Sequence, residues 1–388
     1  MDAQEPAVSF KPLFSRSLAA APGRLHMAAH SHHLWPDASF EGQQEAWADA
    51  ARLADHKWDR VMGEVWPEAQ RHIAAQLNLP SPDSIVFAPN THELLVRILS
   101  ATGKAQPNVL ASDGEFHSFR RQSARWHESG AITLETIATD RADFAEAFLA
   151  RAKSGEHDLI FLSHVMFGSG RVTGFIDQLA SLASPEGPWV VVDGYHAFMA
   201  IDVDLSKLAG RIFYLAGGYK YAMAGEGACF MHAPPGYGER PENTGWFAAF
   251  DDLALKPGQV GYAKDARRYA GATFDPSGLY RFNAVQRMLK GEGLTVARMN
   301  AHIDPLLGSL AAELDETGLG SARLLNPGIL QPRARFLALE SPRAKAWQDA
   351  LAAANIVTDL RGDVLRIGLG LYHDEDDITH LCDVAARL

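Results

Sequence analysis

Two apolar runs decide the fold: Trp189-Val190-Val191-Val192-Asp193 and Ile212-Phe213-Tyr214-Leu215-Ala216. Both are rich in β-branched and aromatic residues and too short for an ordinary helix, so each predicts a buried strand. The first run ends in Asp193, and Lys220 follows shortly after the second. Because open α/β sheets bind ligands at the carboxyl ends of their strands, both side chains are candidates for a functional site.

Similar runs occur along the middle of the chain and alternate with segments of helical length. The other strand candidates are 84–88, 108–111, 132–136, 159–163 and 228–232. Amphipathic stretches at 93–101, 118–129 and 142–153 separate the earlier candidates. This alternation predicts an α/β fold with a mostly parallel, seven-stranded sheet covered by helices. The later runs have no long helices between them, which indicates some antiparallel or edge pairing.

The flanking segments predict three parts. Residues 1–24 are typical of an arm that lies on another surface or another subunit, and 234–276 is an aperiodic segment typical of a functional loop region. Helices are expected from 37 to about 63, from 66, over 278–299 and over 301–314. Strands at 335–339 and 364–369, with helices at 344–354 and from 375, predict a compact α+β unit. We therefore expect an arm and helix joining the small domain (1–60), a large domain (61–275) and a smaller C-terminal domain (276–388).

Composition limits the partners of the chain. Its 388 residues include 36 Lys and Arg against 47 Asp and Glu, a formal net charge of −11. So acidic a surface repels phosphate backbones, so nucleic acid is disfavoured. No apolar stretch approaches the roughly 20 residues that a membrane-spanning helix needs, so no membrane span is expected. The two cysteines, Cys229 and Cys382, lie far apart in a chain without a basic and apolar leader, which predicts a reduced, cytoplasmic setting.

Lys220 and Asp193 together point to a particular chemistry. A lysine held among aromatic residues at a strand end is partly desolvated, which lowers its pKa and makes the amine a nucleophile towards aldehydes. A shielded aspartate needs a cationic partner, although capping the next helix or pairing with an arginine is an equally good interpretation of Asp193 from spacing alone. Catalysis with pyridoxal 5′-phosphate (PLP) needs a lysine for the aldehyde and a carboxylate that keeps the pyridine nitrogen protonated. The pair therefore predicts a PLP enzyme with Lys220 and Asp193 as its catalytic residues.

The segments around these two residues resemble a known superfamily. Asp193-Gly194-Tyr195-His196-Ala197, and Tyr219-Lys220-Tyr221 followed by Gly225, Gly227, Phe230 and His232, are similar to the PLP-dependent fold-type I, class V aminotransferase superfamily, and most to its kynureninases. The resemblance extends from near residue 26 to near residue 380. It implies PLP as cofactor, 61–275 as the PLP-binding domain, a small-molecule amino acid as substrate, and a homodimer with shared active sites.

The same resemblance implies which residues bind the cofactor. Lys220 would form the Schiff base, and Asp193 would hold the pyridine nitrogen. The phosphate would be bound by Tyr219 and by Asn90-Thr91, at a predicted helix N-terminus whose free N–H groups and positive dipole end favour anions. Ordinary helix capping is the alternative interpretation of Asn90-Thr91. Further cofactor contacts are implied for Phe116, Ser163, His196 and, from the neighbouring subunit, Trp246.

Three residues are implied to bind the substrate. Arg366 resembles the family arginine that binds the α-carboxylate, which a planar guanidinium can hold through two parallel hydrogen bonds. A salt bridge to neighbouring acids is its alternative. His30 stands where the kynureninases have an asparagine near the substrate. Asp275-Pro276 stands in the position of an Asn-Pro pair of the family, so Asp275 replaces its asparagine. The replacement at His30 predicts a changed choice of substrate.

The first functional hypothesis is a kynureninase-like hydrolase that cleaves a Cβ–Cγ bond of a small α-amino acid. A class V aminotransferase or an epimerase-like enzyme is the alternative on the same fold, since the residues 371–377 also resemble epimerase-like members. A non-catalytic PLP-fold binding protein is the alternative from another class, and the intact Lys220 and Asp193 argue against it. Cysteine desulfuration is disfavoured because 366–373 contains no cysteine. The histidines at 26, 30, 32 and 33 have no accompanying ligand cluster, so no metal is expected.

Overall fold

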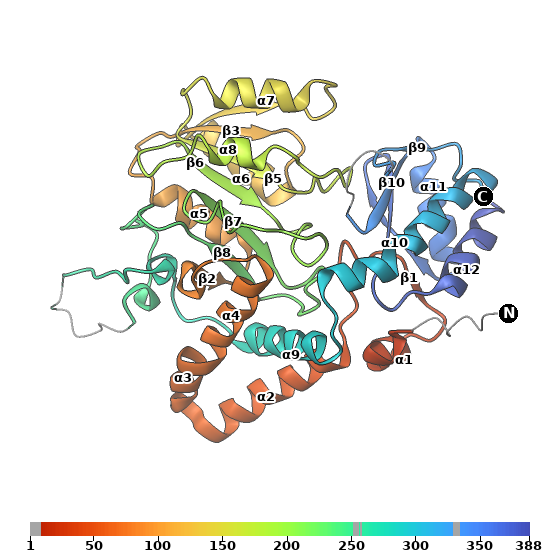
Figure 1. Ribbon diagram of the computed structural model, residues 1–388, viewed down its shortest axis with the longest axis horizontal. Helices are drawn as coiled ribbons and strands as arrows, with labels where there is room; N and C mark the ends of the chain where they lie inside the picture. The colour runs from red at the N-terminus through yellow and green to blue at the C-terminus, as the bar shows by residue number, and fades with distance from the viewer. Residues whose placement is uncertain (1–8, 251–255, 257, 329–333) are drawn as a thin grey trace.

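The computed structural model describes residues 9–250, 256, 258–328 and 334–388, and its largest element is a seven-stranded sheet (Figure 1). The strand order is β2-β8-β7-β6-β5-β3-β4. The strands are β2 (Ile85–Ala88), β3 (Asn108–Ser112), β4 (Thr133–Ile137), β5 (Leu159–Ser163), β6 (Trp189–Asp193), β7 (Ile212–Gly217) and β8 (Cys229–His232). The predicted α/β sheet is therefore confirmed, with each boundary within one residue of its expected position.

Five neighbouring strands of this sheet run parallel. The strands from β4 through β3, β5 and β6 to β7 pair in parallel, whereas β8 is antiparallel to both β7 and β2. The expected antiparallel pairing among the later runs is thus confirmed at β8. At the carboxyl edge, Ser163 of β5 lies opposite Asp193 of β6, and Asp193 lies opposite Leu215 of β7. This edge carries the candidate site.

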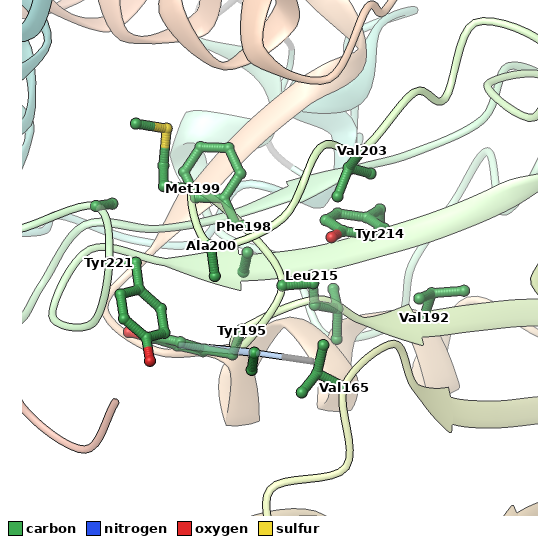
Figure 2. Packing of buried hydrophobic residues seen from close by; sticks show 14 of the residues in the cluster. Val165, Val192, Tyr195, Phe198, Met199, Ala200, Val203, Tyr214, Leu215 and Tyr221 are labelled. Atoms are coloured by element: carbon green, nitrogen blue, oxygen red, sulfur yellow. The ribbon is translucent and has the colours of Figure 1, made fainter. Parts of the chain in front are cut away.

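Helices cover the sheet, as the alternating pattern predicts. They are α5 (Thr91–Ser100), α6 (His117–Glu128), α7 (Phe144–Ala152) and the short α8 (Ile176–Ala180) (Figure 1). No long helix separates β6 from β7. Figure 2 shows that Val203 of this connection lies beside Tyr214 of β7, and Phe198, Met199 and Ala200 belong to the same buried cluster. Apolar side chains of an irregular segment thus cover the strands that carry the site.

A further group of helices lies beside β2. It contains α2 (Asp37–Leu53), α3 (Lys57–Arg60), α4 (Trp66–Gln76) and α9 (Ser277–Gly291), and α9 packs against both α2 and α4 (Figure 1). The helix expected from 37 to about 63 is interrupted, because Ala54 takes a φ of 48° after α2. The single helix expected over 278–299 is wrong. Gly293, at a φ of 63°, separates α9 from α10 (Val296–Glu313), which Thr295 caps.

The C-terminal part forms the expected smaller α+β unit. Its antiparallel sheet has the order β12-β13-β10-β9. Its elements are β9 (Arg323–Leu324), β10 (Phe336–Glu340), α11 (Ala344–Ala353), β12 (Asp359–Arg361), β13 (Val364–Gly368) and α12 (Glu375–Ala385). The shortest strands were not predicted, because two or three residues carry no readable period. The same holds for β1 (Leu25–His26), which pairs in parallel with β11 (Ile356–Val357) and so joins the N-terminal segment to this unit.

The N-terminal arm lies on the small unit of its own chain, whereas the sequence left open another surface or another subunit. It forms a 3-10 helix (Lys11–Phe14) and α1 (Ser15–Ala19), while residues 1–8 lie outside the described part. Lys11 pairs with Asp374 at 2.6 Å, and the buried Phe14 ring meets Tyr372 with centroids 5.1 Å apart. The domain boundaries at 60 and 275 stay predictions.

The expected loop region at 234–276 contains only short 3-10 helices, Trp246–Ala249 and Ala266–Tyr269, among its described residues. Residues 251–255 and 257 of this region lie outside the described part. Across the described ranges, no helix is both long and apolar enough to cross a membrane.

Candidate active site

Lys220 is the centre of a buried polar group. It follows β7, its residue is 4% exposed, and its Nζ lies 2.8 Å from His196 Nε2 and 3.1 Å from His196 Nδ1. Three aromatic rings surround the amine, with Nζ 4.9 Å from the Tyr195 centroid, 5.4 Å from that of Phe116 and 5.6 Å from that of Tyr219. The predicted desolvated lysine among aromatic residues is therefore present.

This environment changes the ionisation of the amine and of its neighbour. Burial lowers the pKa of Lys220 to about 7, against the opposing charge of Asp193. Burial and the Lys220 charge also hold the pKa of His196 well below its ordinary value, so the imidazole is neutral. A neutral imidazole can accept a hydrogen bond from the amine, and the amine loses its proton near neutral pH.

Asp193 ends β6 beside this lysine. Its Oδ1 accepts a hydrogen bond from the Tyr195 amide at 2.9 Å. Burial raises the pKa of Asp193, although the amide of Tyr195 and the charge of Lys220 both oppose the shift. No helix follows β6 in the described residues 194–211, so the helix-capping interpretation is wrong. The Tyr195 bond is a local turn contact to Oδ1 and leaves Oδ2 for another donor.

A second buried carboxylate lies at the same edge, and the sequence reasoning missed it. Glu115 is fully buried, and it accepts hydrogen bonds from Ser112 Oγ and Ser163 Oγ at 2.5 Å each and from the Ser163 amide at 3.3 Å. Burial raises the pKa of Glu115 to about 7, and the charge of Asp193 adds to the shift. Glu115 thereby ties the end of β3 to the end of β5, directly before Phe116.

The N-terminus of α5 borders this edge. The Asn90 side chain caps the helix by accepting a hydrogen bond from the Glu93 amide at 2.9 Å. The alternative interpretation of Asn90 as an ordinary helix cap is therefore confirmed. Burial raises the pKa of the Cys229 thiol in β8 to about 11, although the nearby backbone of Thr91 opposes the shift, and that thiol lies 3.4 Å from the Tyr195 hydroxyl. The N-terminus of α5 therefore lies close to the aromatic group around Lys220.

Arg366 reaches the site from β13 of the small unit. It is 2% exposed, its Nη1 donates to the carbonyl oxygen of Phe167, and its Nη2 donates to Asp359. Its charge contributes to the lowered pKa of Lys220, after burial, which is the main cause. His30 is fully buried and stacks on Phe336 with centroids 4.5 Å apart. Arg366 also lies over Phe336, with Cζ 5.7 Å from the ring centroid, so two of the three predicted substrate residues lie together. Arg366 also makes the salt bridge that its alternative interpretation names.

Two predicted residues lie apart from this group. Trp246 is 42% exposed and donates from Nε1 to Thr273 Oγ1 at 3.2 Å. Asp275 accepts from the Ser277 amide and from the Ser277 hydroxyl at the start of α9. Within the described residues neither contacts Lys220, so their predicted roles stay predictions. No cluster of three or more potential metal ligands occurs in the described part of the chain.

PLP fits the residues that are present. The Lys220 amine is buried and gives up its proton near neutral pH, as a nucleophile towards an aldehyde must. Asp193 has an oxygen available for a protonated ring nitrogen, Phe116 offers a ring face, and the amides of α5 suit a phosphate. The donor set therefore matches the aldehyde, the pyridine ring and the phosphate of this cofactor.

The fold and this site define a PLP-dependent enzyme of the α/β, fold-type I class. The family model described as aminotransferase class V matches residues 43–381, and the chain belongs to this family. Its cofactor is accordingly PLP. Isopenicillin N epimerase of Streptomyces clavuligerus is 27% identical over 375 residues, which cover 87% of this chain and 89% of that protein.

Solved structures show the same fold. The cystine C-S lyase C-DES in complex with cysteine persulfide aligns with a TM-score of 0.81 at 18% identity, covering 95% of this chain and 99% of that chain. The apo cysteine desulfurase of Thermococcus onnurineus aligns with a TM-score of 0.79 at 16% identity, covering 98% and 99%. These likenesses establish the fold alone, and the relatives do not favour the kynureninases over other members.

Proposed function

We propose that the chain acts on a small α-amino acid and that its reaction is a kynureninase-like hydrolysis of a Cβ–Cγ bond. The observation that carries the proposal of an amino-acid enzyme is the contact of Lys220 Nζ with His196 Nε2 at 2.8 Å, buried beside Asp193. The choice of hydrolysis rests on the sequence resemblance to the kynureninases. When bound, PLP supplies an aldehyde for the substrate amine and a ring that accepts electrons from Cα.

The side chains of this chain have separate tasks in the proposal. Lys220 removes the proton from Cα and holds it at Nζ, for which a pKa of about 7 suits a base at neutral pH. His196, neutral and in contact with that amine, orients it. Asp193 holds the ring N–H, and Arg366 binds the α-carboxylate, with His30 and Asp275 assigned to the rest of the substrate.

The remaining assignments concern the cofactor and the assembly. We assign the phosphate to Tyr219 and to the N-terminus of α5, and the ring to Phe116. Ser163 is assigned to the same group through the hydrogen bond that it donates to Glu115. The proposed enzyme is a cytoplasmic homodimer in which Trp246 reaches the cofactor of the neighbouring subunit, which agrees with its 42% exposure.

Epimerisation is the second candidate, and one observation favours it. The similarity to isopenicillin N epimerase extends over 87% of this chain. Epimerisation also begins with removal of the Cα proton, so it needs the same Lys220, but it returns a proton to the opposite face. Transamination on the same cofactor differs again, because it transfers the amino group to a keto acid.

The experiment that separates these reactions is a substrate panel in deuterium oxide. Hydrolysis predicts that L-kynurenine yields anthranilate and alanine without any keto acid. Epimerisation predicts deuterium at Cα together with the D-isomer, and transamination predicts product only when a keto acid is supplied. A protein that holds PLP but exchanges no Cα proton with any amino acid of the panel contradicts the enzyme proposal and supports the binding-protein alternative.

A further inference from the structure

The β12–β13 hairpin places three charged side chains on one face. Asp359 and Arg361 are two residues apart on β12, so they point to the same side of the strand. Arg366 of β13 lies directly opposite Asp359. The side chains meet there: Asp359 Oδ2 accepts a hydrogen bond from Arg366 Nη2. Arg361 Nη1 donates to the Leu360 carbonyl at 2.8 Å and forms an ion pair with Asp359 Oδ1 at 2.9 Å. A single carboxylate therefore holds both guanidinium groups.

Two of the five N–H groups of Arg366 are already bonded in this arrangement. Its Nη1 is bonded to the Phe167 carbonyl and its Nη2 to Asp359, while its buried Nε has no partner among the described residues. A guanidinium holds a carboxylate best through two adjacent N–H groups. A substrate α-carboxylate that pairs with Nε and Nη2 of Arg366 therefore competes with Asp359 for Nη2.

Asp359 has other partners within reach. Arg361 already pairs with its Oδ1, and the Nε of Arg361 is buried without a partner in the described part of the chain. His30 Nε2 lies 3.7 Å from Oδ2, and neither ring nitrogen of His30 has a hydrogen-bond partner there. Release of Arg366 would therefore leave the Asp359 carboxylate with a charged partner and with a buried, unpaired imidazole.

We propose that Asp359 is a positioning residue that occupies Arg366 until the α-carboxylate of the substrate arrives and is then held by Arg361 alone. The inference rests on the proposed role of Arg366 in binding that carboxylate. The exchange conserves ion pairs, because each guanidinium holds one carboxylate once the substrate is bound. A ligand without a carboxylate cannot release Asp359, so the exchange selects for α-carboxylates.

The direct test is Asp359→Asn in the PLP-loaded protein, with L-alanine as the probe. Binding is measured through the absorbance of the cofactor and by calorimetry. Loss of the competing carboxylate is expected to tighten L-alanine binding about tenfold, the scale of one charged hydrogen bond. L-alaninol, which lacks the carboxylate, should gain nothing. Asp363→Asn, at the exposed turn of the same hairpin, is the control that removes the same charge.

Arg361→Gln is the second variant, and it keeps the test open if Asp359→Asn does not fold. It removes the second partner of Asp359, so L-alanine binding is expected to weaken about tenfold although Arg361 does not touch the ligand. Arg323→Gln is its matched control, since Arg323 lies on the opposite edge of the same sheet and pairs with Glu340.

Two results overturn the inference. The first is an Asp359→Asn protein that binds L-alanine no tighter than the unaltered protein, or that gains equally for L-alaninol. The second is an Arg361→Gln protein that binds L-alanine as the Arg323→Gln protein does. The proposed function fails in a different experiment. If borohydride does not fix PLP on Lys220 of the unaltered protein, the proposed function is wrong.

Discussion

At the scale of single residues, burial makes an ordinary lysine reactive. The pKa of Lys220 is lowered by burial to about 7, so most of its amine is unprotonated at pH 8. Only the unprotonated amine attacks an aldehyde. We predict that the rate of PLP uptake by the apo-protein rises up to about pH 7 and then levels off. Stopped-flow absorbance at constant PLP measures it, and a rate that still climbs tenfold per pH unit at pH 9 contradicts the assignment.

Glu115 gives a second prediction at this scale. Its folded pKa is raised by burial to about 7, so its proton stabilises the fold at low pH, and this contribution is lost as the pH rises through 7. Glu115→Gln removes the loss while keeping a group that can bond Ser112 and Ser163. The difference in the free energy of unfolding between the Glu115→Gln variant and the unaltered protein should therefore rise by about 2 kcal/mol from pH 5 to pH 8. Urea unfolding at both pH values checks this, and equal differences at the two would refute it.

The sequence pointed to part of this site for identifiable reasons. Asp193 ends one strand and Lys220 comes after another, and the amino-acid composition reveals both strands. Arg366 was identified through the resemblance to the family. Glu115 and Asp359 were missed, because their importance depends on partners that are distant in sequence or on an adjacent strand. The available signals were an acid next to a predicted stacking ring, and an Asp-x-Arg spacing on one strand face.

At the scale of elements, the strands were easier to predict than the helix ends. Most strands of the large sheet are buried and carry short apolar runs, which composition alone reveals. The edge strand β4 is the exception, since it is partly exposed and contains polar residues. The break between α9 and α10 was missed although the sequence signals it, because Gly291 and Gly293 are unfavourable inside a helix. The positive φ of Gly293 marks the end of the helix in the structure.

The N-terminus of α5 gives the prediction that belongs to this scale. Asn90→Ala removes the hydrogen bond to the Glu93 amide, which should cost about 1 kcal/mol of stability. Because the same turn is proposed to bind the phosphate, PLP should also dissociate faster. Asn90→Ser is the control that restores a cap and should recover most of both properties. Dialysis and absorbance measure the retention of PLP, and equal retention in the alanine variant and the unaltered protein contradicts the phosphate assignment.

At the scale of the whole molecule, the site is built by two parts of the chain. Lys220 follows a strand of the large sheet, whereas Arg366 belongs to the small one, and the Arg366 bond to the Phe167 carbonyl joins them. The sequence predicted both units but not the pairing of β1 with β11, which joins the N-terminal segment to the small unit. Pairs of two-residue strands depend on tertiary contacts that a local pattern does not encode.

The proposed homodimer predicts complementation between two inactive variants. Lys220→Ala lacks the catalytic amine, and Trp246→Ala lacks the ring proposed to reach the neighbouring subunit. A mixed dimer would contain one complete site, with Lys220 from one chain and Trp246 from the other. Activity should therefore return when the two proteins are unfolded and refolded together, whereas either alone stays impaired. A mixture no more active than its components contradicts a shared site.

The most direct measurement for the central claim is chemical labelling of the amine. The PLP-loaded protein is treated with sodium borohydride, digested and mapped by mass spectrometry, with Lys207→Met as the control for an exposed lysine. The account predicts a single phosphopyridoxyl group on Lys220 and loss of the visible absorbance band, with neither occurring in Lys220→Met. Label on another lysine, or a visible band that persists in Lys220→Met, would contradict it.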